Sequence, residues 1–166
     1  MPRFDFYVLP DQKPNGRLLL ACRLAEKAYR LGHRIYIHAS SAAQAENLDE
    51  LLWTFRQGSF VPHAVYPGAA QDNSPVLLGW GESAHRILSA LGSPPGPTAA
   101  QDNRNPDATE GPDTLLINLA PEVPECFEQF HRVAEVVDQE PETLVASRRK
   151  FRYFREQGYQ PEFHKL

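Results

Sequence analysis

The sequence predicts an α/β fold: a three-layer sandwich in which a mostly parallel, Rossmann-like sheet of about five strands lies between helices. Two observations lead to this prediction. Apolar segments of strand length alternate with segments whose apolar residues recur at helical spacing. The chain also begins with a strand, a helix and a second strand, an order that implies a parallel pair with a right-handed crossover. Because no repeat or second compositional regime is present, we expect residues 1–166 to form one domain.

The first part of the chain contains two strands, each followed by a helix. Residues 3–9 are rich in aromatic and β-branched side chains, which favours a strand. Asn15 is placed to cap the helix that follows. Residues 34–38 predict the second strand. Ser41, with Gln44 three positions later, then has the spacing of a capping box at the start of the second helix.

The second part of the chain is less regular. We predict further strands at residues 75–80, 114–119 and 133–138, a short helix near residues 124–130 and a last helix over residues 141–157. Between the first two of these strands, residues 92–112 are dominated by Gly, Pro and small or polar residues, with no large apolar side chain. Since such a segment buries too little surface to offset its ordering entropy, we expect a mobile loop there.

The composition is that of an ordinary soluble globular protein, with 42% hydrophobic and 23% charged residues. No apolar run approaches the roughly 20 residues that a membrane span requires, and the first residues do not have the pattern of a signal peptide. We therefore expect a cytoplasmic location and no membrane partner. A disulfide is not expected in that reducing compartment, and Cys22, within a helical apolar pattern, is predicted to be a buried thiol.

The sequence lacks the common motifs of nucleotide binding and catalysis. The turn after the first strand contains neither the dinucleotide-binding fingerprint nor a phosphate-binding loop, both of which need glycines for close backbone approach to phosphate. No nucleophile elbow is present, no two histidines have the spacing of a helical zinc site, and no pair of carboxylates stands out as an acid–base couple. We therefore expect no catalytic, cofactor or metal site. A nucleotide-dependent or hydrolytic enzyme on a Rossmann-like fold is the alternative.

Positive charge is concentrated in the last helix, although the net charge of the chain is −4. Five of the 17 lysines and arginines lie between residues 148 and 155, a segment without an acidic residue. Arg148, Phe151, Arg152 and Arg155 have the spacing that brings side chains onto one face of a helix. Such a face suits an anionic ligand. Two other interpretations stay open: a solvated cationic face near a helix C-terminus, and direct binding of single-stranded DNA with aromatic rings stacked on bases.

Two segments carry a resemblance to one protein family. Residues 49–53 (Asp-Glu-Leu-Leu-Trp) end the second helix, and residues 59–63 (Ser-Phe-Val-Pro-His) follow at a spacing similar to that in the chi subunit of the bacterial DNA polymerase III clamp-loader assembly. Residues 148–159, a basic and aromatic helix followed by Gly and Tyr, resemble the end of chi proteins. The resemblance covers the chain apart from its Gly- and Pro-rich segment.

The resemblance implies a non-catalytic adaptor with two protein partners. Chi proteins bind the psi subunit on one surface and the acidic C-terminal tail of single-stranded DNA-binding protein (SSB) on another, so their link to nucleic acid is indirect. A repair helicase can also use the psi-binding face. For this chain the resemblance implies a psi-binding surface at Trp53, Phe60, Val61 and Pro62. Aromatic anchors of this kind are typical of interface hot spots, although both rings could instead cap the core.

The resemblance also implies that the SSB tail binds the last helix. Arg148, Phe151 and Arg152 stand where the family has its tail-binding cation, aromatic residue and second cation, and Arg155 extends the same face. The tail ends in Phe, so its receptor needs an apolar slot for the ring and a bidentate donor for the terminal carboxylate. Guanidinium groups around an aromatic ring meet both demands. The family's usual Tyr is Phe151 here, so a hydroxyl contact is lost, and the sequence does not identify the second wall of the slot.

Overall fold

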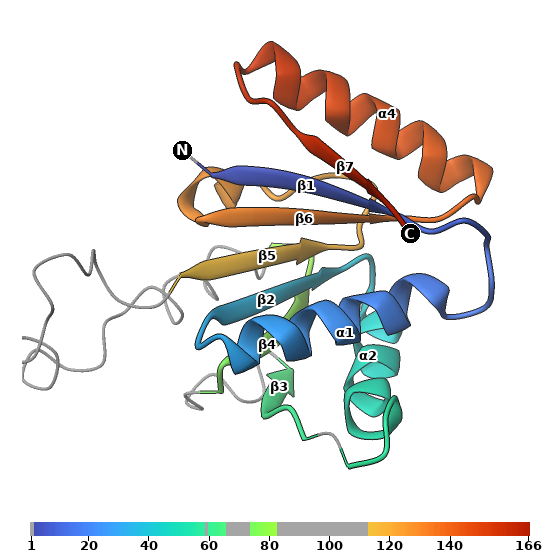
Figure 1. Ribbon diagram of the computed structural model, residues 1–166, viewed down its shortest axis with the longest axis vertical. Coiled ribbons are helices and arrows are strands. Elements are labelled where there is room, and N and C mark those ends of the chain that lie inside the picture. Colours follow the sequence, from blue (N-terminus) through green and yellow to red (C-terminus); the bar gives the residue numbers. More distant parts are fainter. Residues whose placement is uncertain (1, 59, 66–73, 83–112) are drawn as a thin grey trace, which may run out of the picture.

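Seven strands form one parallel sheet in the order β3-β4-β2-β5-β6-β1-β7 (Figure 1). The structure, a computed structural model, describes residues 2–58, 60–65, 74–82 and 113–166. The strands are β1 (Arg3–Val8), β2 (Arg34–Ala39), β3 (His63–Val65), β4 (Val76–Trp80), β5 (Thr114–Asn118), β6 (Arg132–Val137) and β7 (Glu162–Lys165). The helices are α1 (Gly16–Arg30), α2 (Ala42–Thr54), the 3-10 helix η1 (Glu125–Gln129) and α4 (Pro141–Glu156). The loop predicted at residues 92–112 lies outside the described residues.

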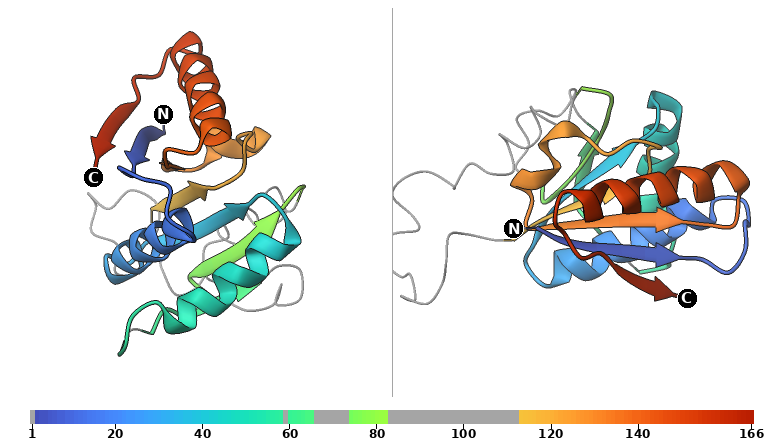
Figure 2. Two further views of the ribbon diagram at one scale, coloured as in Figure 1. Left: turned by 90° about the vertical axis from the view of Figure 1, so that its right-hand side faces the viewer. Right: turned by 90° about the horizontal axis from the view of Figure 1, so that it is seen from above.

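Helices cover both faces of the sheet, which confirms the predicted three-layer α/β sandwich. Helices α1 and α2 lie on one face, and α4 with η1 lies on the other (Figures 1 and 2). Alternation along β2 shows why this strand is apolar throughout. Ile35 and Ile37 point to the α1 and α2 layer while Tyr36 points to the opposite core, and all three are fully buried.

Two strands of the sheet, β3 and β7, were not predicted, whereas the five predicted strands are all present. Both are short and lie at the two edges of the sheet, where only one neighbour supplies hydrogen bonds. Strand β7 has only four residues, Glu-Phe-His-Lys, and three of them are exposed. Strands of three or four residues are too short to show the alternation or the continuous apolar run from which strands are predicted.

The predicted helix boundaries agree with the structure to within a residue or two. Ser41 Oγ accepts the amide of Gln44 at 3.2 Å, and Gln44 Oε1 accepts the amide of Ser40 at 2.8 Å, so the capping box is confirmed with its return bond shifted by one residue. The side-chain cap predicted for Asn15 is wrong. Asn15 holds the N-cap position in a left-handed conformation, with φ of 60°, and its side chain makes no capping hydrogen bond.

The two cysteines of the chain lie in the hydrophobic cores on either side of the sheet. Cys22 and Cys126 are both free and buried, which confirms the buried thiol at Cys22, and burial raises the pKa of Cys22 to about 12.

Among the described residues, none of the helices is both long and apolar enough to span a bilayer.

Candidate functional site

Helix α4 is fixed in rotation by an aromatic cluster beneath it. Phe154 is fully buried, with its ring centroid 4.2 Å from that of Phe4 on β1 and 5.5 Å from that of Phe127 on η1. Anchoring Phe154 on the sheet turns the side chains at i−3, i−2 and i+1 toward the edge strand β7. These three positions are Phe151, Arg152 and Arg155.

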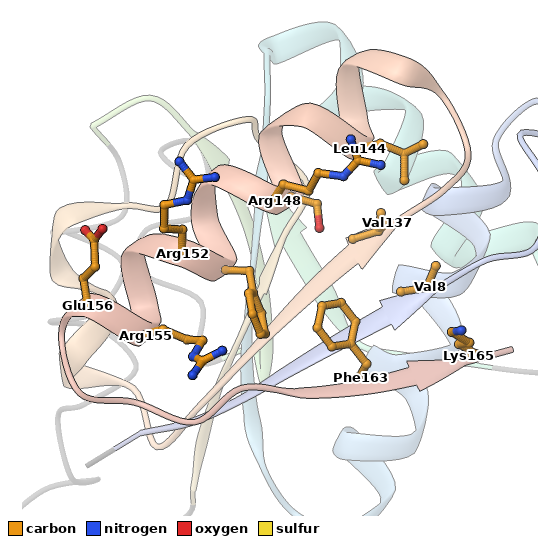
Figure 3. Close-up of a pocket in the computed structure, with 11 residues that line it drawn as sticks. Val8, Val137, Leu144, Arg148, Arg152, Arg155, Glu156, Phe163 and Lys165 are labelled. Atoms are coloured by element: carbon orange, nitrogen blue, oxygen red, sulfur yellow. The ribbon is translucent and has the colours of Figure 1, made fainter.

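The four residues predicted to bind an acidic tail line one cavity. Arg148, Phe151, Arg152 and Arg155 all contribute to a cavity of about 730 Å³ between α4 and β7. We call it the α4–β7 groove (Figure 3). In Figure 3, Arg148 lies toward one end of the groove and Arg152 with Arg155 toward the other. The sequence prediction that these side chains share a face is therefore confirmed, while their role in binding stays a prediction.

The floor and the second wall of the groove come from residues that the sequence did not single out. Val8, Val137 and Leu144 contribute apolar surface, and strand β7 contributes Phe163 and Lys165 (Figure 3). The ring of Phe163 lies 4.9 Å from that of Phe151, measured between centroids, and Phe6 stacks edge-on against Phe151 at 5.8 Å. Phe163 was missed because strand β7 was not predicted. Only the formation of a strand over residues 162–165 brings this side chain to the groove.

The cations of the groove have no acidic partner within the described parts of the chain. Arg148, Arg152, Arg155 and Lys165 are exposed and take part in none of the ion pairs found there. The guanidinium of Arg155 instead lies 5.8 Å from the centroid of the Phe151 ring, within the range of a cation–π contact. The groove therefore combines an apolar floor with unpaired positive charge, an arrangement that favours an apolar ligand carrying carboxylates.

Lys150 is the exception in the basic segment, because it points into the protein. Its Nζ lies 2.5 Å from Glu135 Oε1 and donates to the carbonyl of Ala120 at 3.0 Å, while Asn118 donates to the other oxygen of Glu135 at 2.9 Å. Burial raises the pKa of Glu135, and the charge of Lys150 acts against that rise. The cationic run thus contains one structural lysine. Arg149 lies in a separate hollow beside Tyr153 and outside the groove.

A second surface lies at the end of α2, where two large aromatic residues are exposed. Trp53 is 50% exposed and Phe60 is 65% exposed, and their ring centroids are 5.5 Å apart. Pro62 is partly buried beside them. Val61 was predicted to belong to this surface, but its side chain is fully buried in the core below, so we assign it to the support of the segment and not to the exposed face.

His63 holds this segment against α2. Its Nδ1 lies 2.7 Å from the carbonyl oxygen of Val61, and its Nε2 lies 3.0 Å from Asp49 Oδ1. The imidazole also lies under the Trp53 ring, with centroids 4.4 Å apart. These contacts tie the end of α2 to the start of β3 and fix the position of both exposed rings.

One group of titratable side chains outside these surfaces has the composition of a metal site. Asp5, Glu162 and His164 bring three potential metal-ligand atoms within 4.8 Å of one another. Asp5, however, already accepts from Arg132 Nε at 2.7 Å and pairs with His164 at 2.8 Å. A cation here would face the charge of Arg132, so we interpret the group as an ion-pair network that joins β7 to β1 and β6.

Comparison with known proteins identifies relatives along the whole chain. The family model described as DNA polymerase III chi subunit, HolC, matches residues 1–162. The chain is 43% identical to DNA polymerase III subunit chi of Pseudomonas aeruginosa over 166 residues, which cover 100% of this chain and 98% of that protein. It is 28% identical to subunit chi of Haemophilus influenzae over 93% of this chain and 91% of that protein. With subunit chi of Escherichia coli it shares 32% identity over 84 residues, 48% of this chain and 57% of that protein.

Proposed function

The chain belongs to the DNA polymerase III chi subunit family, a family of DNA replication subunits, and from this premise we propose that it is a non-catalytic adaptor with two docking surfaces. In this proposal the α4–β7 groove binds the acidic C-terminal tail of SSB, and the Trp53 and Phe60 surface binds the psi subunit. The adaptor thereby links the clamp loader to template DNA coated with SSB, and its contact with nucleic acid is indirect.

The observation that carries the proposal is the make-up of the α4–β7 groove. An SSB tail presents several carboxylates and a terminal Phe, so its binding site needs positive charge and an apolar slot close to each other. The groove offers both: Arg148, Arg152 and Arg155 on one wall, and an apolar floor beside Phe151. A planar guanidinium can hold the terminal carboxylate with two parallel hydrogen bonds, which an ammonium group cannot do.

The second surface suits a partner that supplies apolar contacts. Trp53 and Phe60 lie side by side with half or more of their surface exposed, which is unusual for residues of this size in a monomer. Large aromatic groups in a fixed position are typical of interface hot spots. We propose psi as the partner, and a repair helicase that uses the same face would then compete with psi.

The positions of the two surfaces support simultaneous binding. The groove lies along β7, at one edge of the sheet, whereas Trp53 and Phe60 adjoin β3, at the opposite edge. Five other strands separate these two edge strands in the sheet order. A partner at one edge therefore leaves the other edge accessible, as an adaptor requires.

A bridging experiment tests the proposal with the full chain. Labelled SSB tail peptide is passed over a size-exclusion column with psi, with and without the chain. We expect the peptide to elute with psi only when the chain is present, in a complex that contains all three components. Mutual displacement of psi and peptide would contradict the adaptor, because both would then use the same surface.

A further inference from the structure

Helix α4 has a second flank, which faces η1 instead of β7. Arg149 and Tyr153, four positions apart, lie on this flank. Together with Lys150 and residues of the segment 121–127 they line a hollow of about 330 Å³, which we call the α4–η1 hollow. Its described lining residues are all different from those of the α4–β7 groove, so the helix separates two distinct surfaces.

The floor of the α4–η1 hollow is apolar and firmly packed. Phe127 is buried, and its ring lies nearly perpendicular to that of Tyr153 with centroids 6.1 Å apart. Val123 and Pro121 extend this apolar surface. Tyr153 stays 42% exposed although its ring packs against Phe127. A tyrosine that is fixed in position and still open to solvent is typical of an interface hot spot.

The rim of the hollow is acidic. Glu122 and Glu125 line it, and Glu128 follows three residues further along; all three are exposed. None of them takes part in an ion pair within residues 2–58, 60–65, 74–82 and 113–166. Of the two cations in the described lining, Lys150 is already paired with a buried carboxylate. Negative charge therefore exceeds positive charge around the apolar floor.

A smaller hollow of about 180 Å³ continues the acidic rim. It shares two lining residues with the α4–η1 hollow and adds Glu140 and Glu142, both exposed. Neither carboxylate belongs to an ion pair in the part of the chain that the structure describes. Arg17 also lines this hollow, but its guanidinium donates to two main-chain carbonyls. The acidic surface is thus long enough to contact several residues of a ligand.

A buried polar network holds the segment that carries the rim. Lys150 Nζ donates to the carbonyl of Ala120 at 3.0 Å, and Asn118 Nδ2 donates to the carbonyl of Glu122 at 3.2 Å. Asn118 Oδ1 accepts the amide of Ala120 at 3.0 Å. Glu135 accepts from both Lys150 and Asn118 and so joins the two donors. Because the segment is already ordered, a ligand binds it with little further loss of conformational entropy.

We propose that the α4–η1 hollow docks a basic segment of a partner protein: an aromatic or long aliphatic side chain enters the hollow, and flanking lysines or arginines pair with the acidic rim. Charge complementarity selects this occupant, since an acidic peptide or a nucleic acid would meet unpaired carboxylates. The inference goes beyond the proposed function, which assigns neither the SSB tail nor psi to this surface.

The two walls of the hollow suit different parts of such a segment. The carboxylates of Glu122 and Glu125 stand on the wall formed by the segment 121–127, where they can accept from ammonium or guanidinium groups. Arg149 and Tyr153 stand on the α4 wall. A guanidinium and a phenol ring there can both stack on an aromatic side chain that enters between the walls.

Titration of the isotope-labelled full chain with a basic peptide tests the surface by two-dimensional NMR. The probe is Arg-Lys-Leu-Phe-Lys-Arg with an acetylated N-terminus and an amidated C-terminus, so it offers no terminal carboxylate to the α4–β7 groove. A second peptide replaces Leu-Phe with Ser-Ser and keeps the charge. A third replaces the four basic residues with Glu.

The probe should shift the amide signals of residues 121–128 and 149–153. Raising the salt concentration should weaken binding, because the rim pairs are exposed. The peptide with Ser-Ser should bind more weakly than the probe, and the acidic peptide should leave these signals unchanged. The absence of shifts in the two segments at millimolar probe would overturn the proposal, as would equal affinity for the peptide with Ser-Ser.

Variants of the floor and the rim test the two parts of the contact. Tyr153→Ala should weaken binding of the probe by roughly 5- to 30-fold, as for an interface hot spot, whereas Tyr153→Phe should bind almost as the wild type does. Glu122→Gln and Glu125→Gln should each weaken binding by roughly 2- to 5-fold at low salt, as for one exposed ion pair. For the peptide with Ser-Ser, Tyr153→Ala should cause little further loss.

Matched controls come from the same chain. Glu46→Gln removes an exposed carboxylate of α2, on the opposite face of the sheet, and Phe60→Ala removes an exposed ring of the Trp53 surface. Arg152→Ala changes the other flank of α4. None of the three should alter affinity for the probe by as much as Tyr153→Ala does. Thermal unfolding of every variant identifies a general loss of structure.

The outcomes separate this inference from the proposed function. If a folded Tyr153→Ala variant binds the probe as the wild type does, or if the shifts gather on another surface, the role of the α4–η1 hollow is overturned. The proposed function is then unaffected, because binding of the acidic tail peptide and of psi is measured independently. Failure of the tail peptide to bind would likewise leave the present inference in place.

Discussion

Phe151 of α4 and Phe163 of β7 pack against each other in the groove with ring centroids 4.9 Å apart, although 12 positions separate them in sequence. The turn at Gly158, where φ is 95°, reverses the chain between helix and strand and makes this pairing possible. The two packed rings place an apolar patch beside the cations of the helix. A cationic face alone would attract any anion, whereas an apolar patch flanked by cations favours one that ends in an apolar ring.

Arg152→Ala should weaken binding of an SSB tail peptide by about 1–3 kcal/mol, the range for removing a charged hydrogen-bond partner. Isothermal titration calorimetry measures this loss directly. Arg149→Ala is the matched control, since Arg149 lies on the same helix but lines a separate hollow. Equal losses in both variants would indicate attraction by overall charge and not recognition in the groove.

Lys150→Met should destabilise the fold by about 3–5 kcal/mol, because Glu135 would keep a buried charge without its partner. Urea unfolding monitored by circular dichroism measures the difference. The double variant with Glu135→Gln should recover much of the loss, since the unpaired charge is then absent. A single Lys150→Met variant as stable as the wild type would show that the pair contributes little.

The sequence predicted the position of Arg152 on the helix face but not the burial of Lys150. Helical periodicity correctly placed Arg148, Phe151, Arg152 and Arg155 on one face, because 3.6 residues per turn is a local property. The burial of Lys150 depends on Glu135, which lies on another element and is brought within 2.5 Å only by the tertiary fold. Spacing within the helix carries no information about that partner.

Trp53→Ala should impair binding to psi and leave affinity for the SSB tail unchanged. The Trp53 ring is half exposed and rests on His63, so its removal takes away interface area with little loss of core packing. A pull-down with tagged psi, run beside the peptide titration, provides both measurements. Normal psi binding by a folded Trp53→Ala variant would show that psi docks elsewhere.

The free energy of unfolding should fall in mild acid because His38 is buried in its neutral form. The side chain is buried, with its Nδ1 2.5 Å from the Tyr36 hydroxyl, and desolvation, with a smaller effect of Lys150, lowers the pKa of His38 to about 4. The unfolded chain binds this proton near pH 6.5, so stability from the neutral form is present above that pH. As pH falls from about 6.5 to 4, we expect a loss of up to about 3 kcal/mol.

The His38→Gln variant identifies this contribution. Its free energy of unfolding, measured by urea titration across the same pH range, should vary less steeply than that of the wild type. Parallel pH profiles for the two proteins would assign the acid sensitivity to other groups.

The parts of the fold and of the site that the sequence did not predict lie at the edges of the sheet. The central strands are buried on two faces, and their continuous apolar patterns identified them. Strands β3 and β7 are stabilised by pairing with β4 and β1, which their own sequences do not reveal. The second wall of the groove was missed for the same reason, since Phe163 and Lys165 belong to β7. Trp53 and Phe60, predicted to belong to a binding surface, are exposed, whereas Val61 of the same motif is buried, and their role in binding stays a prediction.

The central claim is that the α4–β7 groove recognises an acidic peptide through its terminal residue. The most direct measurement is fluorescence anisotropy of a labelled acidic peptide ending in Pro-Phe, titrated with the full chain at low and high salt beside its amidated form and labelled oligo-dT. We predict salt-sensitive binding that amidation of the terminal carboxylate abolishes, with no affinity for oligo-dT. Equal binding of the free and amidated peptides, or preference for oligo-dT, would contradict the claim and leave α4 as a general anionic surface contact.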